Sequence, residues 1–367
     1  MFYRKYRPQT FSEVVGQDLV IKILKNIIKS QKIPHGYLFA GEHGTGKTTV
    51  ARIFAKTLNC LKNESGEPCQ ECSSCKLFNE NKFLDLIEID AASNRGIDEI
   101  RNLKEHIGFQ PIQGKYKVFI IDEAHMLTEP AFNALLKTLE EPPRHAIFIL
   151  ATTDPNKILP TILSRVQRFN FRRIPLKLIF EKLKLIAQLE NIKITDGALW
   201  LIAEESQGSL RDAETLLEKL SFALNPHSIL DEDLVSSLLG KVGLFHLLTF
   251  LECLANRDFE KAIKIVQEIY TEGHDLELFL KSLLKILREM LLLKTITDYE
   301  KHLKYIYPEE SLIKIKILSQ KISVNYCQFL IKKFLEAETL LKKDLPIPVL
   351  ALEIVLVSLM EKSDLNN

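Results

Sequence analysis

The residues with the most specific chemistry form a glycine-rich octapeptide and the threonine after it: Gly41, Glu42, His43, Gly44, Thr45, Gly46, Lys47, Thr48 and Thr49. The octapeptide fits the pattern G-x-x-x-x-G-K-[ST], in which backbone N–H groups at the start of a helix surround phosphate oxygens. The apolar run YLFA precedes it and TTVARIFAKTL follows, so a strand and a helix flank the loop. Lys47 would reach the β- and γ-phosphates of a nucleotide and Thr48 would bind Mg²⁺. A nucleotide-binding loop is favoured over a chance turn.

Two carboxylates follow the apolar run at 118–121. Asp122 would end a strand beside the phosphate loop and could bind Mg²⁺ through water, which leaves Glu123 placed to polarise a water molecule for attack on the γ-phosphate. A plain helix N-cap is the alternative, but the upstream loop favours hydrolysis. His125 is expected to pack rather than to catalyse.

Thr153 and Arg211 are weaker candidates. Thr153 lies at the end of another apolar run, where a hydroxyl could bond the γ-phosphate or the attacking water, although strands end in threonine for many reasons. Gly208 and Ser209 read as a helix stop and a new N-cap, which places Arg211 in a first turn. The helix dipole disfavours a cation there by about 0.3–1 kcal/mol, so a nearby phosphate would supply a partner.

Four cysteines crowd into a short stretch: Cys60, Cys69, Cys72 and Cys75. Four thiolates suit a tetrahedral structural Zn²⁺, and such a site contributes about 10–16 kcal/mol in free peptides. An iron–sulfur cluster is the competing interpretation, because C-x2-C-x2-C resembles part of a ferredoxin run. No cysteine followed by proline completes that run, so zinc is favoured. Cys253 and Cys327 are expected in the core.

Parallel strands must position these residues. Short apolar runs separated by amphipathic stretches predict a parallel sheet covered on both faces by helices. The expected strands are Gly36–Ala40, Leu84–Ile89, Lys117–Ile121, Ala146–Ala151 and, more weakly, Gln167–Phe171, with helices at Asp98–Ile107 and Pro130–Glu140. After Pro175 the pattern is helical throughout, first in short segments and then, from about 241 to 361, in longer ones.

The bulk composition is that of an ordinary globular protein. Of 367 residues, 46% are hydrophobic and 26% are charged, and the net charge is +1. So small a charge argues against coating of nucleic acid, and any DNA contact must be local. The chain opens without the apolar run of a signal peptide and holds no run long enough to span a bilayer. We therefore expect a cytoplasmic protein without a membrane partner.

Several segments together carry a family resemblance. They are YRPQTFSEVVGQ at 6–17, the phosphate loop, the four-cysteine insert, IDAASNRGIDEIR at 89–101, KVFIIDEAHMLTEPAFNALLKTLEEPP at 117–143, ATTDPNKI at 151–158 and LSR at 163–165. The chain resembles the gamma/tau subunits of bacterial DNA polymerase III, the AAA+ motors of sliding-clamp loaders. The resemblance covers about residues 2–230 and is weaker beyond, and the insert is its most specific feature.

The resemblance implies three domains and a tail. An α/β AAA+ nucleotide-binding domain would span 1–173, with the zinc insert at about 60–75. A small helical lid domain would span 174–238 and a helical collar, which joins subunits into a pentamer, 239–361, leaving a tail at 362–367. The chain length resembles that of the short form of this subunit, or of a truncated piece.

The resemblance also assigns roles to residues. Arg7 and Val15, the latter within Val14-Val15-Gly16, would pack against adenine and ribose. Thr153 matches the first sensor of the nucleotide and Arg211 the second.

Two further roles concern partners. Ser164-Arg165 matches a Ser-Arg-Cys motif whose arginine enters the ATP site of the adjacent subunit; here Val166 replaces the cysteine. Asn94, Arg95 and Gly96 would face DNA, with Gly96 in place of a residue that is often basic.

The expected function is ATPase-driven clamp loading within the DNA-directed DNA polymerase III holoenzyme, at the nucleoid-associated replisome, without a polymerase active site in this chain. ATP binding with Mg²⁺ would let copies of the chain, with delta and delta-prime subunits, open the sliding clamp. Primer–template DNA would then trigger hydrolysis and release. The alternatives are a catalytically silent clamp-loader scaffold and an AAA+ motor for branch migration or helicase loading.

Metal analysis tests the cysteine interpretation. The purified protein should contain about one zinc ion per chain, because four thiolates form a closed tetrahedral site. Iron accompanied by visible absorbance would contradict this assignment and favour the cluster.

Overall fold

The computed structural model describes residues 1–63, 65–93, 96, 103, 105–223, 229–240, 242–303, 307, 309–343 and 345–364. These form two compact units. One comprises Met1–Asn191 with Ile202–Lys219, and the other Ile192–Leu201 with Leu220–Asn367. Asn94, Arg95 and most of the helix expected at Asp98–Ile107 lie outside the described residues.

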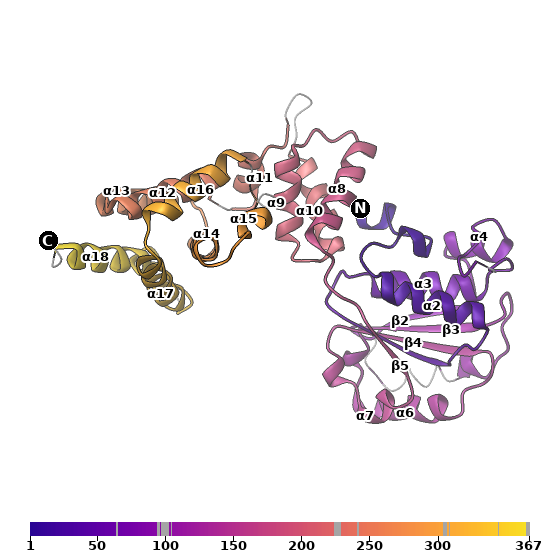
Figure 1. Ribbon diagram of the computed structural model, residues 1–367. Coiled ribbons are helices and arrows are strands. Elements are labelled where there is room, and N and C mark those ends of the chain that lie inside the picture. Colours follow the sequence, from indigo (N-terminus) through magenta and orange to yellow (C-terminus); the bar gives the residue numbers. More distant parts are fainter. Residues whose placement is uncertain are drawn as a thin grey trace. The chain divides into compact units, whose positions relative to one another are not determined.

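The first unit is built on a sheet that has, within its described residues, five parallel strands in the order β2-β3-β4-β1-β5 (Figure 1). The strands are β1 (Gly36–Ala40), β2 (Leu86–Asp90), β3 (Lys117–Asp122), β4 (Ala146–Thr152) and β5 (Gln167–Asn170). All five expected strands are confirmed, with ends shifted by at most two residues. β2 begins at Leu86 and not at Leu84, because the Leu84 N–H donates to the Gln113 side chain, 2.9 Å away.

Helices cover both faces of the sheet (Figure 1). Alternate strand residues point to opposite faces, so Tyr37 and Phe39 pack with α2 and α3 while Leu38 packs with α6 and α7. The helices of this unit are α1 (Phe2–Lys5), η1 (Phe11–Glu13), α2 (Asp18–Ser30), α3 (Lys47–Leu58), α4 (Ser73–Asn79), η2 (Ala124–Met126), α6 (Glu129–Glu140), η3 (Pro155–Lys157), α7 (Pro160–Leu163) and α8 (Leu176–Leu189). The predicted parallel α/β arrangement is confirmed.

Two helices, α9 (Asp196–Glu205) and α10 (Leu210–Ser221), divide between the units. The remaining helices of the second unit are α11 (Glu232–Leu238), α12 (Leu244–Asn256), α13 (Phe259–Thr271), α14 (Leu276–Thr295), α15 (Tyr299–Leu303), α16 (Glu309–Lys321), α17 (Val324–Leu341) and α18 (Leu350–Asp364). Phe250, Phe279 and Phe334 are fully buried at its core, and Cys253 and Cys327 are buried there as expected. The predicted helical C-terminal part is therefore confirmed.

No helix in the described part of the chain is long and apolar enough to cross a membrane.

Candidate functional site

The candidate site lies at the carboxyl edge of the sheet, where the neighbouring strands end. Ala40 of β1 is paired with Thr152 of β4, and the Gly41 N–H continues the ladder by donating to the Thr152 carbonyl oxygen at 3.1 Å. Asp122 ends β3 on the other side of β4. Parallel pairing therefore brings the phosphate loop, the acidic pair and the threonine end of β4 to one place.

The phosphate loop turns through two glycines with left-handed backbone angles. Gly44 has φ +69° and Gly46 has φ +100°, and α3 begins directly afterwards at Lys47. A Cβ at Gly44 would lie 1.9 Å from the Ser209 hydroxyl oxygen, so the close approach also requires glycine. The loop thereby ends at a helix N-terminus, whose free N–H groups favour an anion.

Lys47 lies inside this loop and is only 5% exposed. Its Nζ donates to the carbonyl oxygens of Gly41 at 2.8 Å and Glu42 at 2.9 Å. Burial lowers the pKa of Lys47, while the carboxylates of Glu123 and Asp122 act in the opposite direction. A cation thus lies between the loop and the acidic pair, where a phosphate would supply the opposite charge.

The two predicted magnesium ligands are in contact. The Thr48 Oγ1 donates a hydrogen bond to Asp122 Oδ2 at 2.7 Å. A hydroxyl and a carboxylate are oxygen donors of the kind that Mg²⁺ binds together with nucleotide phosphates. These residues therefore fit the ion that the phosphate loop implies.

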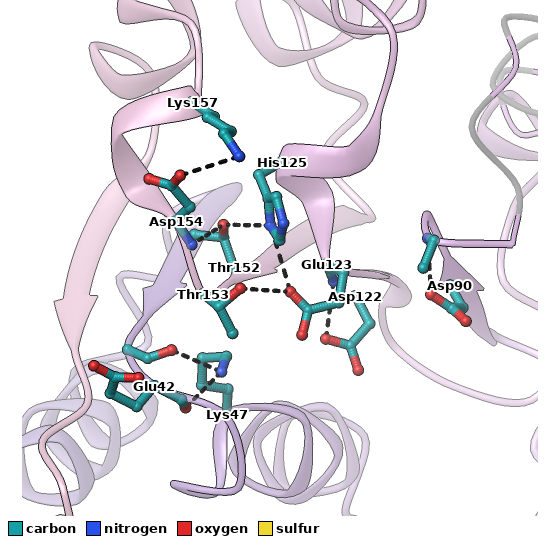
Figure 2. Close-up of polar contacts among 12 residues, drawn as sticks. Glu42, Lys47, Asp90, Asp122, Glu123, His125, Thr152, Thr153, Asp154 and Lys157 are labelled. Atoms are coloured by element: carbon teal, nitrogen blue, oxygen red, sulfur yellow. Dashed lines mark hydrogen bonds and ion pairs between the residues drawn. The ribbon is translucent and has the colours of Figure 1, made fainter. Parts of the chain in front are cut away.

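Glu123 is oriented by two neighbours that point toward it (Figure 2). Its backbone is left-handed, with φ 47° and ψ 45°, and its Oε2 accepts a hydrogen bond from Thr153 Oγ1 at 3.1 Å. His125 Nδ1 lies 3.4 Å from the same oxygen and 3.1 Å from Thr152 Oγ1. The sequence indicated Thr153 but not the contact that His125 makes, because that contact depends on the turn at η2.

A pocket runs from the acidic pair to the N-terminal segment. Its lining residues are Tyr3, Arg7, Pro8, Val14, Val15, His43, Gly44, Thr45, Gly46, Lys47, Thr48, Thr49, Asp122, Glu123, Ile174, Leu210, Arg211 and Glu214. Gly41 and Glu42 border it through their contacts with Lys47, whereas Thr153 and Arg165 are not among the lining residues. Most of the predicted nucleotide-binding residues therefore share one pocket.

Five lining residues were not indicated by the sequence: Tyr3, Pro8, Ile174, Leu210 and Glu214. Leu210 and Glu214 lie on the same helix as Arg211. The helical spacing of these three residues could therefore have indicated that they line the pocket together. The others follow from tertiary contacts, which periodicity does not report.

Arg211 reaches the phosphate loop from α10. The Ser209 Oγ caps this helix by accepting the Asp212 N–H at 3.3 Å, as the sequence predicts, and the Leu210 N–H donates to the Gly44 carbonyl oxygen at 3.1 Å. The Arg211 guanidinium lies 4.8 Å from the centre of the Tyr3 ring and 3.4 Å from His43 Nε2. The first turn of α10 thus places a cation beside the phosphate loop.

Gln17 joins the loop to the segment after β5. This residue is 3% exposed, and its Nε2 donates to the carbonyl oxygens of Thr45 at 3.2 Å and Arg172 at 2.8 Å. Its Oε1 accepts the Arg172 N–H at 3.2 Å. The buried amide therefore joins the loop, at Thr45, to the segment after β5, at Arg172.

Arg165 lies apart from the pocket of its own chain. Its guanidinium contacts Glu140 Oε1 at 2.7 Å and the Thr161 carbonyl oxygen at 2.6 Å. One third of its side chain is exposed (33%). The structure thus places this cation on a surface of the first unit.

The four clustered cysteines converge. The Sγ atoms of Cys60, Cys69, Cys72 and Cys75 all lie within 4.8 Å of one another, and those of Cys72 and Cys60 are 4.0 Å apart. A tetrahedral ion with metal–sulfur bonds of 2.3 Å requires sulfurs about 3.8 Å apart. A cluster whose thiolates bind different iron atoms requires wider spacing. The arrangement therefore fits a single four-thiolate metal ion.

Backbone N–H groups support the thiolates. Cys60 Sγ accepts from the Lys62 and Cys69 N–H groups at 3.4 and 3.3 Å, and Cys69 Sγ accepts from the Cys72 N–H at 3.4 Å. Burial acts to raise the pKa of Cys69, but the N–H groups of Cys72 and Glu71 help to bring it down to about 6. Burial raises the pKa of Cys75. Cys72 caps α4 and the buried Cys75 lies within it, so the start of this helix presents two of the sulfur atoms.

The cysteine insert is tied to the segment that lines the pocket. Gln70 Nε2 donates to the Gln9 carbonyl oxygen at 2.8 Å, and the Phe11 N–H donates to Glu67 Oε2 at 2.9 Å. Arg7 and Pro8, directly before these contacts, line the pocket.

Comparison with protein families matches nearly the whole chain. Residues 16–175 match "DNA polymerase III, delta subunit", residues 178–219 match "DNA polymerase III clamp loader subunit, ATPase lid domain", and residues 230–367 match "DNA polymerase III subunits gamma and tau domain III".

Curated relatives agree with these matches. DNA polymerase III subunit tau of Bacillus subtilis is 42% identical over 310 residues, which is 84% of this chain and 54% of the relative. The gamma/tau subunit of Mycoplasma genitalium is 44% identical over 285 residues (77% and 47%), and subunit tau of Escherichia coli is 40% identical over 287 (78% and 44%). The chain thus spans about half the length of these relatives. It belongs to the gamma/tau family of DNA polymerase III subunits.

Proposed function

We propose that this chain is the ATP-driven motor subunit of a sliding-clamp loader. The observation that carries the proposal is the meeting of Lys47, Thr48, Asp122 and Glu123 at one pocket beside a helix N-terminus. A silent scaffold would need none of these groups together. The ATPase-lid match at residues 178–219 supports the same function.

Nucleotide binding uses the loop and the first turn of α3. The N–H groups of Gly44 to Thr49 surround the phosphates, and Lys47 contributes positive charge at the β- and γ-phosphates. Thr48 and Asp122 would hold Mg²⁺, which would neutralise charge on the phosphate oxygens. Arg7 and Val15 contact the adenosine part of the nucleotide. Arg211 contacts the γ-phosphate, so the position of α10 responds to whether that phosphate is present.

Hydrolysis uses Glu123 as the base that orients water. Thr153 and His125 hold its Oε2, at 3.1 and 3.4 Å, so the direction of the carboxylate is set by the end of β4 and the turn at η2.

The pocket is completed by Arg165 of an adjacent copy. Its place outside the pocket of its own chain, on an exposed ion pair with Glu140, supports action on a neighbour. A guanidinium donated across an interface stabilises charge on the transferring phosphoryl group and contributes about 10³–10⁵ in rate in such enzymes.

The partners proposed are delta and delta-prime subunits, further copies of this chain, the sliding clamp and primer–template DNA, at the cytoplasmic, nucleoid-associated replisome. The DNA contact expected for Asn94, Arg95 and Gly96 stays a proposal, and Asn94 and Arg95 lie outside the described residues. The four thiolates are proposed to hold structural Zn²⁺, which fits their separations.

Substitution of the proposed base should separate binding from hydrolysis. In the assembled loader with clamp and primed DNA, Glu123→Gln should lower ATP turnover by roughly 10²–10⁴, because the amide cannot take a proton. ATP affinity, measured by titration, should change little. Glu141→Gln on the exposed end of α6 is the matched control. Unchanged ATP turnover in Glu123→Gln would contradict the assignment of Glu123 as the base.

Arg165→Ala, mixed into assemblies with wild-type chains, should leave ATP binding intact while hydrolysis falls by about 10³. The control is Glu140→Ala, which removes the ion-pair partner within the chain and should leave turnover near the wild-type rate. Equal losses of turnover in both variants would mean that Arg165 acts through its ion pair with Glu140 in the same chain, and not on a neighbouring copy.

Gly44→Ala should weaken ATP binding at least tenfold, because the methyl group collides with Ser209 and the backbone is left-handed there. Gly108→Ala, whose nearest neighbour is 3.7 Å away, is the control and should bind normally. Titration with a fluorescent ATP analogue gives both affinities. Normal binding by Gly44→Ala would contradict the described loop.

A further inference from the structure

A buried carboxyl group lies in the nucleotide pocket and has no part in the chemistry proposed above. Glu214, on α10, is 5% exposed and lines the pocket. Burying a carboxylate costs free energy unless a partner compensates, so its presence in a partly apolar lining requires an explanation.

Glu214 belongs to the end of the pocket away from the phosphates. The N-terminus of α10 contacts the phosphate loop, through the Leu210 N–H and the Gly44 carbonyl oxygen. Glu214 follows Arg211 by three residues on the same face, which places it about 4.5 Å farther along the helix axis. Arg7 is close enough to influence its charge.

The apolar lining supports the same placement. Val14, Val15 and Ile174 line the pocket with Glu214, and none of them can bind phosphate. If the phosphates lie at Lys47, as proposed above, this end of the pocket receives the base. The following inference rests on that proposed nucleotide binding.

We propose that the Glu214 carboxyl group contacts the base of the bound nucleotide and sets the preference for adenine over guanine. A neutral carboxyl group can donate its O–H to adenine N1 and accept a hydrogen bond from the N6 amino group. An ionised carboxylate can only accept, so it matches the N1–H and N2–H donors of guanine and faces the lone pair of adenine N1 unfavourably.

The electrostatic surroundings make both forms accessible near neutral pH. Burial raises the pKa of Glu214 to about 7, although Lys182 on α8 and Arg7 on the N-terminal segment act to lower it. Arg211 and Tyr3 also line this pocket. The group is therefore mainly neutral below this pH and mainly ionised above it, so the preference for ATP over GTP should fall as the pH rises.

Competition titration of the full chain tests this inference. ATP and GTP would each displace a ribose-labelled fluorescent ATP analogue from the wild type, Glu214→Gln and Glu214→Leu at pH 6 and pH 8. Between the two pH values the neutral fraction falls about tenfold and the ionised fraction rises about tenfold. Because the neutral form favours ATP and the ionised form favours GTP, the wild-type ratio of ATP to GTP affinity should fall by up to about a hundredfold. Glu214→Gln keeps one donor and one acceptor, so its ratio should stay high at both. At pH 6 the ratio of ATP to GTP affinity in Glu214→Leu should be roughly tenfold lower than in the wild type.

Lys182→Met removes a positive charge that lowers the pKa of Glu214, so in this variant the preference for ATP should persist to a higher pH than in the wild type. If both Glu214 variants keep the wild-type ratio at both pH values and only melt at lower temperature, Glu214 is structural and the inference is overturned. If the wild type binds neither nucleotide, the proposed nucleotide binding itself fails. If it binds ATP and GTP with a pH-independent ratio that Glu214→Leu does not change, only the base contact fails.

Discussion

Parallel register in the sheet is the constraint on which the site depends. β4 lies between β3 and β1, and its pairing sets Ala40 beside Thr152 and Ile121 beside Leu150. The carboxyl ends of β1, β3 and β4 therefore lie at the same edge of the sheet. The residues that follow these strands are brought together at the pocket. A slip of one residue in any of these pairs would invert its side chains and separate Lys47 from the acidic pair.

The sheet supplies only the end of the pocket at Lys47 and the acidic pair. The rest comes from segments distant in sequence: residues 3–15, Ile174 and the first turns of α10. The N-terminal segment also contacts the cysteine insert through Gln9 and Phe11. The insert is thus joined to the segment that lines the pocket by hydrogen bonds between its side chains and main-chain groups.

Local patterns allowed prediction of the strands, the phosphate loop and the four-cysteine cluster, because these depend on neighbours in sequence or on turns. The convergence of Thr48 with Asp122 also followed from the sequence, because Asp122 was expected at the carboxyl end of a strand beside the phosphate loop. The contact of His125 with Glu123, the amide bridge of Gln17 and the burial of Glu214 could not be predicted, because each depends on how separate elements meet. The role proposed for Arg165 came from the family resemblance and not from a local pattern, because it would depend on a second chain.

The amide of Gln17 has a consequence for which side chains that position can accept. Its nitrogen faces two carbonyl oxygens while its oxygen faces an N–H. Glutamate has the same shape, but it would set lone pairs against lone pairs, and leucine would leave all three backbone groups without a partner. Asparagine is one methylene too short to reach both sides. Glutamate, leucine and asparagine, the residues most similar to glutamine in shape or chemistry, should therefore all be unfavourable at this position.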